Sequence, residues 1–199
     1  MAATVFLVRH AAHDLVDQVL CGRMPGVHLG EAGRRQAVAV ARRLAGAGLA
    51  GVYSSPLPRA HETAEAIAGA SGGAVAIREE LNEIDFGAWT GRRLAELGDD
   101  PHWRRWNTER DRERPPGGEA MREAQARAFN CLQRLTEAHP DAAIAAISHG
   151  DVIKSVVAAV LGLPLDGYAR FDIDTASVTT IAFWHGGAKV LRMNEAVPA

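Results

Sequence analysis

The chain has 199 residues, of which 47% are hydrophobic and 23% charged, a composition typical of a folded globular protein rather than a disordered or fibrous one. This length predicts one domain, residues 1–199, instead of two large ones. The formal net charge of −2 offers no global basic field to a nucleic acid, and no apolar run approaches the roughly 18 residues of a membrane-spanning helix, so we expect neither partner.

Short apolar runs rich in β-forming residues alternate with segments of helical periodicity. In chain order, the expected elements are strand Thr4–Val8, helix Glu31–Ala47, strand Gly51–Tyr53, helix Arg59–Ala70, strand Ala74–Ile77, helix Ala120–Ala138, strand Ala142–Ile147, helix Val152–Leu161 and strands Val178–Trp184 and Lys189–Met193. This alternation predicts an α/β fold with a largely parallel sheet.

Two of these segments refine the expected sheet. Ala142–Ile147 is apolar at every position, which is typical of a central strand covered on both faces by helices. The last two strands are joined by His185-Gly186-Gly187, which predicts a hairpin. We therefore expect a mostly parallel sheet with an antiparallel strand toward one edge.

Residues 98–118 interrupt the alternation. They contain Trp103, Trp106, five arginines and the helix-breaking run Pro115-Pro116-Gly117-Gly118. A long insertion of this kind in a compact domain is often an active-site lid, and its arginines would suit a substrate with a second anionic group. The alternative is an amphipathic helix whose two tryptophans pack on the core.

The two cysteines, Cys21 and Cys131, lie far apart and form no C-x-x-C pair. Their spacing predicts neither a disulfide framework nor a cysteine zinc site. The residues before Arg9 form a short apolar run without a basic segment, which does not resemble a signal peptide. A cytoplasmic location is the resulting expectation.

Ionisable residues follow four of the predicted strands, where a parallel sheet binds its ligands. They are Arg9 and His10, then Arg59, then Glu83, then His149. Forked arginine donors suit phosphoryl oxygens, and the helices that begin near 59 and 150 would direct their N-terminal amides to the same place. The sequence therefore predicts a phosphate pocket at this edge.

The residue types at these strand ends also suggest a reaction. A neutral His10 imidazole could attack phosphorus, and Glu83 could protonate the departing alkoxide. An arginine beside the imidazole would disfavour its protonated form, while His149 as an imidazolium could donate to the phosphoryl oxygens.

Several motifs, taken together and in this order, resemble the histidine phosphatase superfamily, also called phosphoglycerate mutase-like. They are Leu7-Val8-Arg9-His10, residues 29–37, residues 54–64, residues 81–91, Pro116-Gly117-Gly118-Glu119 and Ser148-His149-Gly150. The resemblance covers nearly the whole chain. It implies a three-layer α/β/α sandwich, His10 as phosphorylated nucleophile, Glu83 as proton donor, a phosphate pocket of Arg9, Arg59 and His149, and neither a metal nor another cofactor.

The chain departs from the superfamily pattern after His10. The pattern continues with glycine, an acidic residue or glutamine, and then threonine or serine, whereas this chain has Ala11-Ala12-His13-Asp14. We expect His13 or Asp14 to replace the lost polar contacts. Cys21-Gly22-Arg23 falls where the superfamily has a substrate-contacting loop, so the resemblance makes these three residues and Gly150 candidates for substrate binding.

With 199 residues, the chain resembles the short phosphatase branch of this superfamily, which includes α-ribazole phosphatase-like and broad-specificity enzymes. The expected function is metal-independent hydrolysis of a small phosphorylated metabolite through a phosphohistidine. Three alternatives stay open: phosphoglycerate mutase-type transfer, a non-catalytic phospholigand-binding protein, and a metal-dependent phosphohydrolase, against which the forked arginines argue. The oligomeric state is also open, with a homodimer among the expectations.

Overall fold

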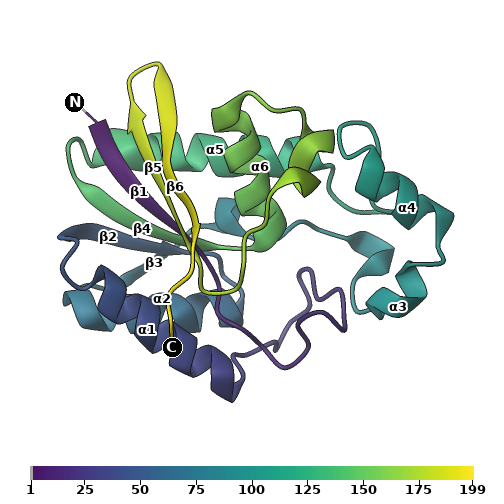
Figure 1. The fold of residues 1–199 in the computed structure, drawn as a ribbon, viewed down its shortest axis with the longest axis horizontal. Coiled ribbons are helices and arrows are strands. Elements are labelled where there is room, and N and C mark those ends of the chain that lie inside the picture. Colours follow the sequence, from purple (N-terminus) through teal and green to yellow (C-terminus); the bar gives the residue numbers. More distant parts are fainter. Residues whose placement is uncertain (1) are drawn as a thin grey trace.

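The computed structural model describes residues 2–199, which build a mixed six-stranded sheet flanked by helices (Figure 1). In chain order the elements are β1 (Ala2–Arg9), α1 (Glu31–Leu44), β2 (Leu49–Ser54), α2 (Pro58–Ser71), β3 (Val75–Ile77), α3 (Leu94–Leu97), α4 (Pro101–Thr108), α5 (Met121–Ala138), β4 (Ala143–Ser148), α6 (Gly150–Leu161), β5 (Val178–Trp184) and β6 (Gly187–Glu195). Three short 3-10 helices lie at Glu79–Leu81, Gly87–Trp89 and Leu165–Arg170. The α/β prediction is confirmed.

The strand order in the sheet is β3-β2-β4-β1-β5-β6. The first four strands in this order run parallel, whereas β5 is antiparallel to both β1 and β6. The apolar strand β4 lies between β2 and β1 and is buried from Ile144 to Ser148. The predicted central strand and the predicted C-terminal hairpin are therefore both confirmed.

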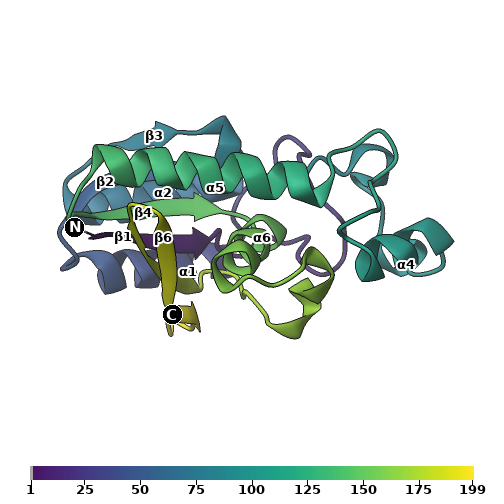
Figure 2. The same ribbon diagram turned by 90° about the horizontal axis from the view of Figure 1, so that it is seen from above.

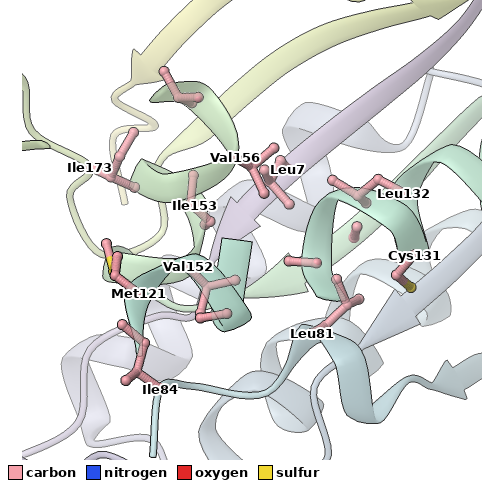
Figure 3. Packing of buried hydrophobic residues seen from close by; sticks show 14 of the residues in the cluster. Leu7, Leu81, Ile84, Met121, Cys131, Leu132, Val152, Ile153, Val156 and Ile173 are labelled. Carbon is pink, nitrogen blue, oxygen red and sulfur yellow. The ribbon is translucent and has the colours of Figure 1, made fainter. Parts of the chain in front are cut away.

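Helices cover both faces of the sheet (Figure 2). On one face α1 and α2 pack against Val8 and Ile147, and on the other α5 and α6 pack against Leu7 and Ala146. Consecutive residues of one strand thus pack against helices on opposite faces of the sheet, as the alternation of side chains along a strand requires. Figure 3 shows the cluster under α5 and α6, which reaches from Leu7 to Ile84 beside the strand ends.

The residues that begin and end the helices explain their bounds. Pro58 occupies the first turn of α2, where its missing N–H is not needed, and Gly72 ends this helix with a φ of +71°. Asp100 begins α4 by accepting hydrogen bonds from the backbone N–H groups of His102 and Trp103. Within residues 2–199, no helix has both the length and the apolar character needed to cross a bilayer.

Residues 98–118 form α4 and the loop that follows it, beyond the carboxyl ends of the parallel strands (Figures 1 and 2). Trp106 is fully buried and Trp103 half-buried, and both rings lie against the ring of Trp89. These contacts agree with the amphipathic-helix alternative for this segment.

Candidate active site

A cavity of about 440 Å³ lies at the carboxyl ends of the parallel strands. Its walls come from residues 9–22 after β1, from the start of α2, from Glu83, from the start of α6 and from residues 172–175. The predicted residues Arg9, His10, Arg59 and Glu83 all line it. The structure therefore brings four of the five ionisable residues predicted from the strand ends to one cavity, and the fifth, His149, lies outside its lining.

His10 is the first residue after β1, and its backbone N–H donates to the carbonyl of Ser148 at the end of β4 (2.9 Å). The side-chain Nδ1 donates to the carbonyl of Ala11 (2.8 Å), so that Nε2 carries the lone pair. Burial, reinforced by the charges of Arg59 and Arg9, holds the pKa of His10 well below its usual value. The imidazole is therefore neutral, with its lone pair on Nε2.

Arg59 lies at the start of α2 and is 1% exposed. Its Nε donates to Nε2 of His10 (3.2 Å) and its Nη2 donates to the carbonyl of Gly22 (2.8 Å). The third nitrogen, Nη1, is buried with no hydrogen-bond partner in the described part of the chain. A buried guanidinium with an unused N–H is a ready anion site.

Arg9 supplies a second guanidinium to the same cavity. Its Nη1 donates to the carbonyl of Ile173 (2.7 Å), and its Nε is buried and finds no partner among residues 2–199. Gly150 makes room for this side chain, because a Cβ at that position would lie 3.4 Å from Cζ and Nε of Arg9. Arg9 and Arg59 therefore concentrate positive charge next to His10.

Glu83 follows the short 3-10 helix Glu79–Leu81, and its Oε1 accepts from the backbone N–H of Ile84 (2.9 Å). Burial raises the pKa of this carboxyl to about 7, and the negative charge of Asp151 acts in the same direction. The main-chain carbonyl of Glu83 accepts from Arg23 and Arg127, which anchors the residue. A carboxyl with this pKa can both give and take a proton near neutrality.

His149 differs from its expected role. It is fully buried behind Arg59 and does not line the cavity, although its ring centroid is 5.1 Å from that of His10. Its Nδ1 accepts from Nη2 of Arg59 (3.2 Å), so its Nε2 donates to Oγ of Ser55 (2.8 Å). Burial and Arg59 hold the pKa of His149 well below its usual value, so it is a neutral support for Arg59 rather than an imidazolium.

The candidate substrate loop divides into two parts. Cys21 and Gly22 line the cavity, and Gly22 has a φ of +48° that favours glycine. Arg23 does not line it, because its guanidinium bonds to Glu119 (2.9 Å) and to the carbonyl of Glu83 (2.8 Å). Arg23 therefore lies near the site as expected, but its guanidinium holds neighbouring protein groups in place instead of facing the cavity.

The family model for the histidine phosphatase superfamily (branch 1) matches residues 5–196. The chain belongs to this superfamily. It is 30% identical to phosphoserine phosphatase 1 of Hydrogenobacter thermophilus over 96% of this chain and 91% of that protein. It is also 30% identical to a probable phosphoglycerate mutase of Cronobacter sakazakii over 90% of this chain and 84% of that protein.

The chain spans about half the length of the mycobacterial relatives it matches: a bifunctional protein of Mycobacterium tuberculosis is 33% identical over 95% of this chain and 52% of its own length. Among solved structures, a mycobacterial glucosyl-3-phosphoglycerate phosphatase superposes with a TM-score of 0.88 at 27% identity, covering 98% of this chain and 100% of the other. A putative α-ribazole-5′-phosphate phosphatase of Escherichia coli superposes with a TM-score of 0.86 at 26% identity, over the full length of both chains.

His13 lies next to His10 at the cavity. This residue lines the cavity, is 9% exposed, and has its ring centroid 5.5 Å from that of His10. Burial and the two arginines lower its pKa to about 4, so it too is neutral. Asp14 is exposed and does not line the cavity, so of the two residues expected to replace the lost polar contacts, only His13 lies at the cavity.

The arginines of residues 98–118 do not reach the cavity, which no residue of this segment lines. Four of the five are engaged by carboxylates: Arg104 by Asp99, Arg105 by Glu113, Arg110 by Asp151 and Arg114 by Glu123. The expectation that they bind a second anionic group of the substrate is therefore not supported.

Other residues that the sequence interpretation missed complete the walls. They are Val16, Asp17, Val19, Leu20, Asp151, Lys154 and residues 172–175, together with Phe86 and Leu94. Asp151 could have been found from the sequence, because it directly follows His149-Gly150, just beyond the end of β4. Among residues 2–199, no three His, Cys, Asp or Glu side chains are grouped so that they could hold a metal ion.

Proposed function

We propose that this protein is a phosphomonoesterase that hydrolyses a small phosphorylated metabolite through a phosphohistidine at Nε2 of His10. Superfamily membership and the named relatives indicate phosphatase or mutase activity. One observation carries the finer proposal. A neutral His10 shares a cavity with two arginines that retain unused N–H groups and with a carboxyl whose pKa is about 7.

Substrate binding would use the unused donors. The phosphoryl oxygens accept from Nη1 of Arg59 and from Nε of Arg9, which are buried and lack partners elsewhere in the described chain. Nε of Arg59 now donates to Nε2 of His10, and a phosphoryl oxygen would draw that N–H away and free the lone pair. Binding and activation of the nucleophile would then be one event.

In the first chemical step, Nε2 of His10 forms a bond to phosphorus as the bond to the leaving oxygen breaks. The carboxyl proton of Glu83 moves to that oxygen, so the product leaves as an alcohol. In the second step, Glu83 as carboxylate takes a proton from water, whose oxygen attacks phosphorus and releases phosphate and neutral His10. Glu83 ends protonated, as it began.

The test is hydrolysis of p-nitrophenyl phosphate between pH 5 and 8 in excess chelator, for the wild type and for His10→Ala. We expect activity that survives chelation in the wild type and is lost in the variant, together with an acid-labile, base-stable phosphoenzyme on rapid quenching. Wild-type activity in His10→Ala would contradict the mechanism. Transfer of phosphate to a phosphoglycerate in preference to water would instead identify a mutase.

A further inference from the structure

Asp151 connects the cavity with residues 98–118. It lies in the first turn of α6 and lines the cavity together with Glu83. Its Oδ2 accepts a hydrogen bond from Nη1 of Arg110 (2.9 Å). Arg110 itself does not line the cavity, so it can affect the chemistry only through a neighbour.

The guanidinium of Arg110 is held firmly in place. The side chain is 2% exposed, and its Nη2 donates to Oδ1 of Asn107 (2.8 Å) and to the hydroxyl of Tyr168 (2.6 Å). Its Cζ lies 3.7 Å from the centroid of the Tyr168 ring and 4.7 Å from that of Trp106. A cation buried between two aromatic rings has little freedom, so it fixes the carboxylate that pairs with it.

The groups around Glu83 show why a fixed Asp151 matters. Arg59 and Arg9 favour the ionised form of Glu83, as does the hydrogen bond from Ile84. Nδ1 of His149 lies 3.9 Å from Oε2 of Glu83, and that ring is neutral. Arg23 and Arg127 bind the main-chain carbonyl. Asp151 lines the same cavity as Glu83, and its negative charge opposes the two arginines by favouring the protonated carboxyl.

We propose that Arg110 and Asp151 are positioning residues for proton transfer. Arg110, from the 98–118 segment, fixes the Asp151 carboxylate in the wall of the cavity that also holds Glu83, and this fixed charge keeps the proton on Glu83 until the leaving oxygen takes it. The proposal rests on the proposed function, in which Glu83 is the acid. It gives residues 98–118 a part in the reaction although none of them touches the substrate cavity.

The choice of leaving group separates this role from a general loss of structure. p-Nitrophenolate leaves with little need of a proton, whereas the alkoxide of glycerol 2-phosphate must be protonated. In Asp151→Asn, which preserves side-chain shape, we expect kcat for glycerol 2-phosphate to fall about tenfold and kcat for p-nitrophenyl phosphate to change much less. Arg110→Met should show the same selective loss, and in an Asp151→Asn background it should cause no further loss.

The control is Arg105→Met, since Arg105 lies in the same segment, is exposed, and pairs with Glu113. It should leave the ratio of the two activities unchanged. Equal losses on both substrates in Asp151→Asn, or an Arg110→Met loss that is just as large in the Asp151→Asn background, would overturn the proposal. If Arg110→Met fails to fold in a thermal melt, Arg110→Lys replaces it.

A second measurement needs no turnover. The titration of the Glu83 carboxyl carbon, followed by NMR, should move to lower pH by at least about 0.5 unit in Asp151→Asn and stay in place in Arg105→Met. An unmoved titration in Asp151→Asn overturns the proposal even if the wild type hydrolyses both esters. Conversely, a wild type that hydrolyses neither ester contradicts the proposed function, whatever the titration shows.

Discussion

Nε of Arg59 donates a hydrogen bond to Nε2 of His10 across 3.2 Å, at the one imidazole nitrogen that Ala11 leaves free. The cation thus occupies the lone pair that the reaction needs, and it also keeps the imidazole unprotonated. A ligand that competes for the guanidinium exposes the nucleophile, whereas a proton, which brings another positive charge, is disfavoured. Binding of an anion to Arg59, rather than protonation of His10, is therefore what changes this pair.

Replacing Arg59 should therefore lower activity through the loss of its hydrogen bonds as well as through the loss of its charge. Arg59→Lys keeps a cation but loses the fork that reaches His10, Gly22 and His149. We expect kcat/KM for p-nitrophenyl phosphate to fall about 100-fold in Arg59→Lys and further in Arg59→Ala, about 3 kcal/mol or more of transition-state stabilisation. The exposed Arg34→Ala serves as a matched control. A lysine variant with near wild-type kcat/KM would show that charge alone suffices.

The pH dependence follows from two opposite protonation requirements. His10 must be neutral, and its lowered pKa allows this well below pH 6.5. Glu83 must be protonated, and its pKa of about 7 sets the other limit. We expect kcat/KM for an alkyl phosphate to decline as pH rises through about 7, and Glu83→Gln to abolish this alkaline limb together with most activity. A wild-type rate that still rises between pH 7 and 8 would argue against Glu83 as the acid.

Gly150 provides a test of the Arg9 position. A Cβ there would lie 3.4 Å from Cζ and Nε of Arg9, at the short limit of van der Waals contact, so it would press against the guanidinium. We expect Gly150→Ala to weaken the binding of inorganic phosphate, measured by calorimetry, by about tenfold, because oriented contacts tolerate little displacement. Gly69→Ala in α2, where a Cβ would meet nothing within 4 Å, should bind as the wild type does. Equal affinities in both variants would mean that Arg9 moves freely.

His13 should make the fold sensitive to acid. Its pKa is about 4 in the folded chain against 6.5 as the ordinary value, so between these two pH values the unfolded chain binds more protons. The free energy of unfolding should consequently fall as pH drops from 6.5 to 4, with up to about 3 kcal/mol attributable to this residue. Urea unfolding of His13→Gln at pH 7 and pH 4.5 should show a smaller decrease than the wild type. The exposed His185→Gln should match the wild type at both pH values, and an unchanged pH dependence in His13→Gln would refute the assignment.

The sequence was sufficient for the sheet and for the floor of the cavity, for a physical reason. Arg9 ends β1, His10 follows it, and Arg59 begins the helix after β2. The alternation of elements predicts that these strands run parallel, so their ends meet at one edge of the sheet. Residues 172–175 could not be placed this way, because they reach the cavity through an irregular segment after α6. Their contribution, including the carbonyl that holds Arg9, depends on packing that leaves no local pattern.

Two other features depended on burial. The protonation of His149 could not be inferred from residue type, since a solvent-exposed histidine is partly protonated near neutral pH, whereas burial and Arg59 lower the pKa of this one. Arg110 was grouped with the other arginines of residues 98–118 as a candidate for binding a second anionic group of the substrate. Its buried position could not be foreseen, because arginine is rarely fully buried and its partner Asp151 is 41 positions away. Neither outcome contradicts the fold, but each changes the chemistry expected of the site.

The hydrogen bond from Arg9 to the carbonyl of Ile173 joins residues 164 positions apart. A chain emerging from the ribosome presents Arg9 and His10 early, yet the carbonyl that holds this guanidinium is absent until residue 173 has been synthesised, and β5 adds to β1 later still. Phosphate affinity should therefore appear only when folding is nearly complete. For this protein, turnover would report on the integrity of the whole chain rather than on that of its N-terminal half.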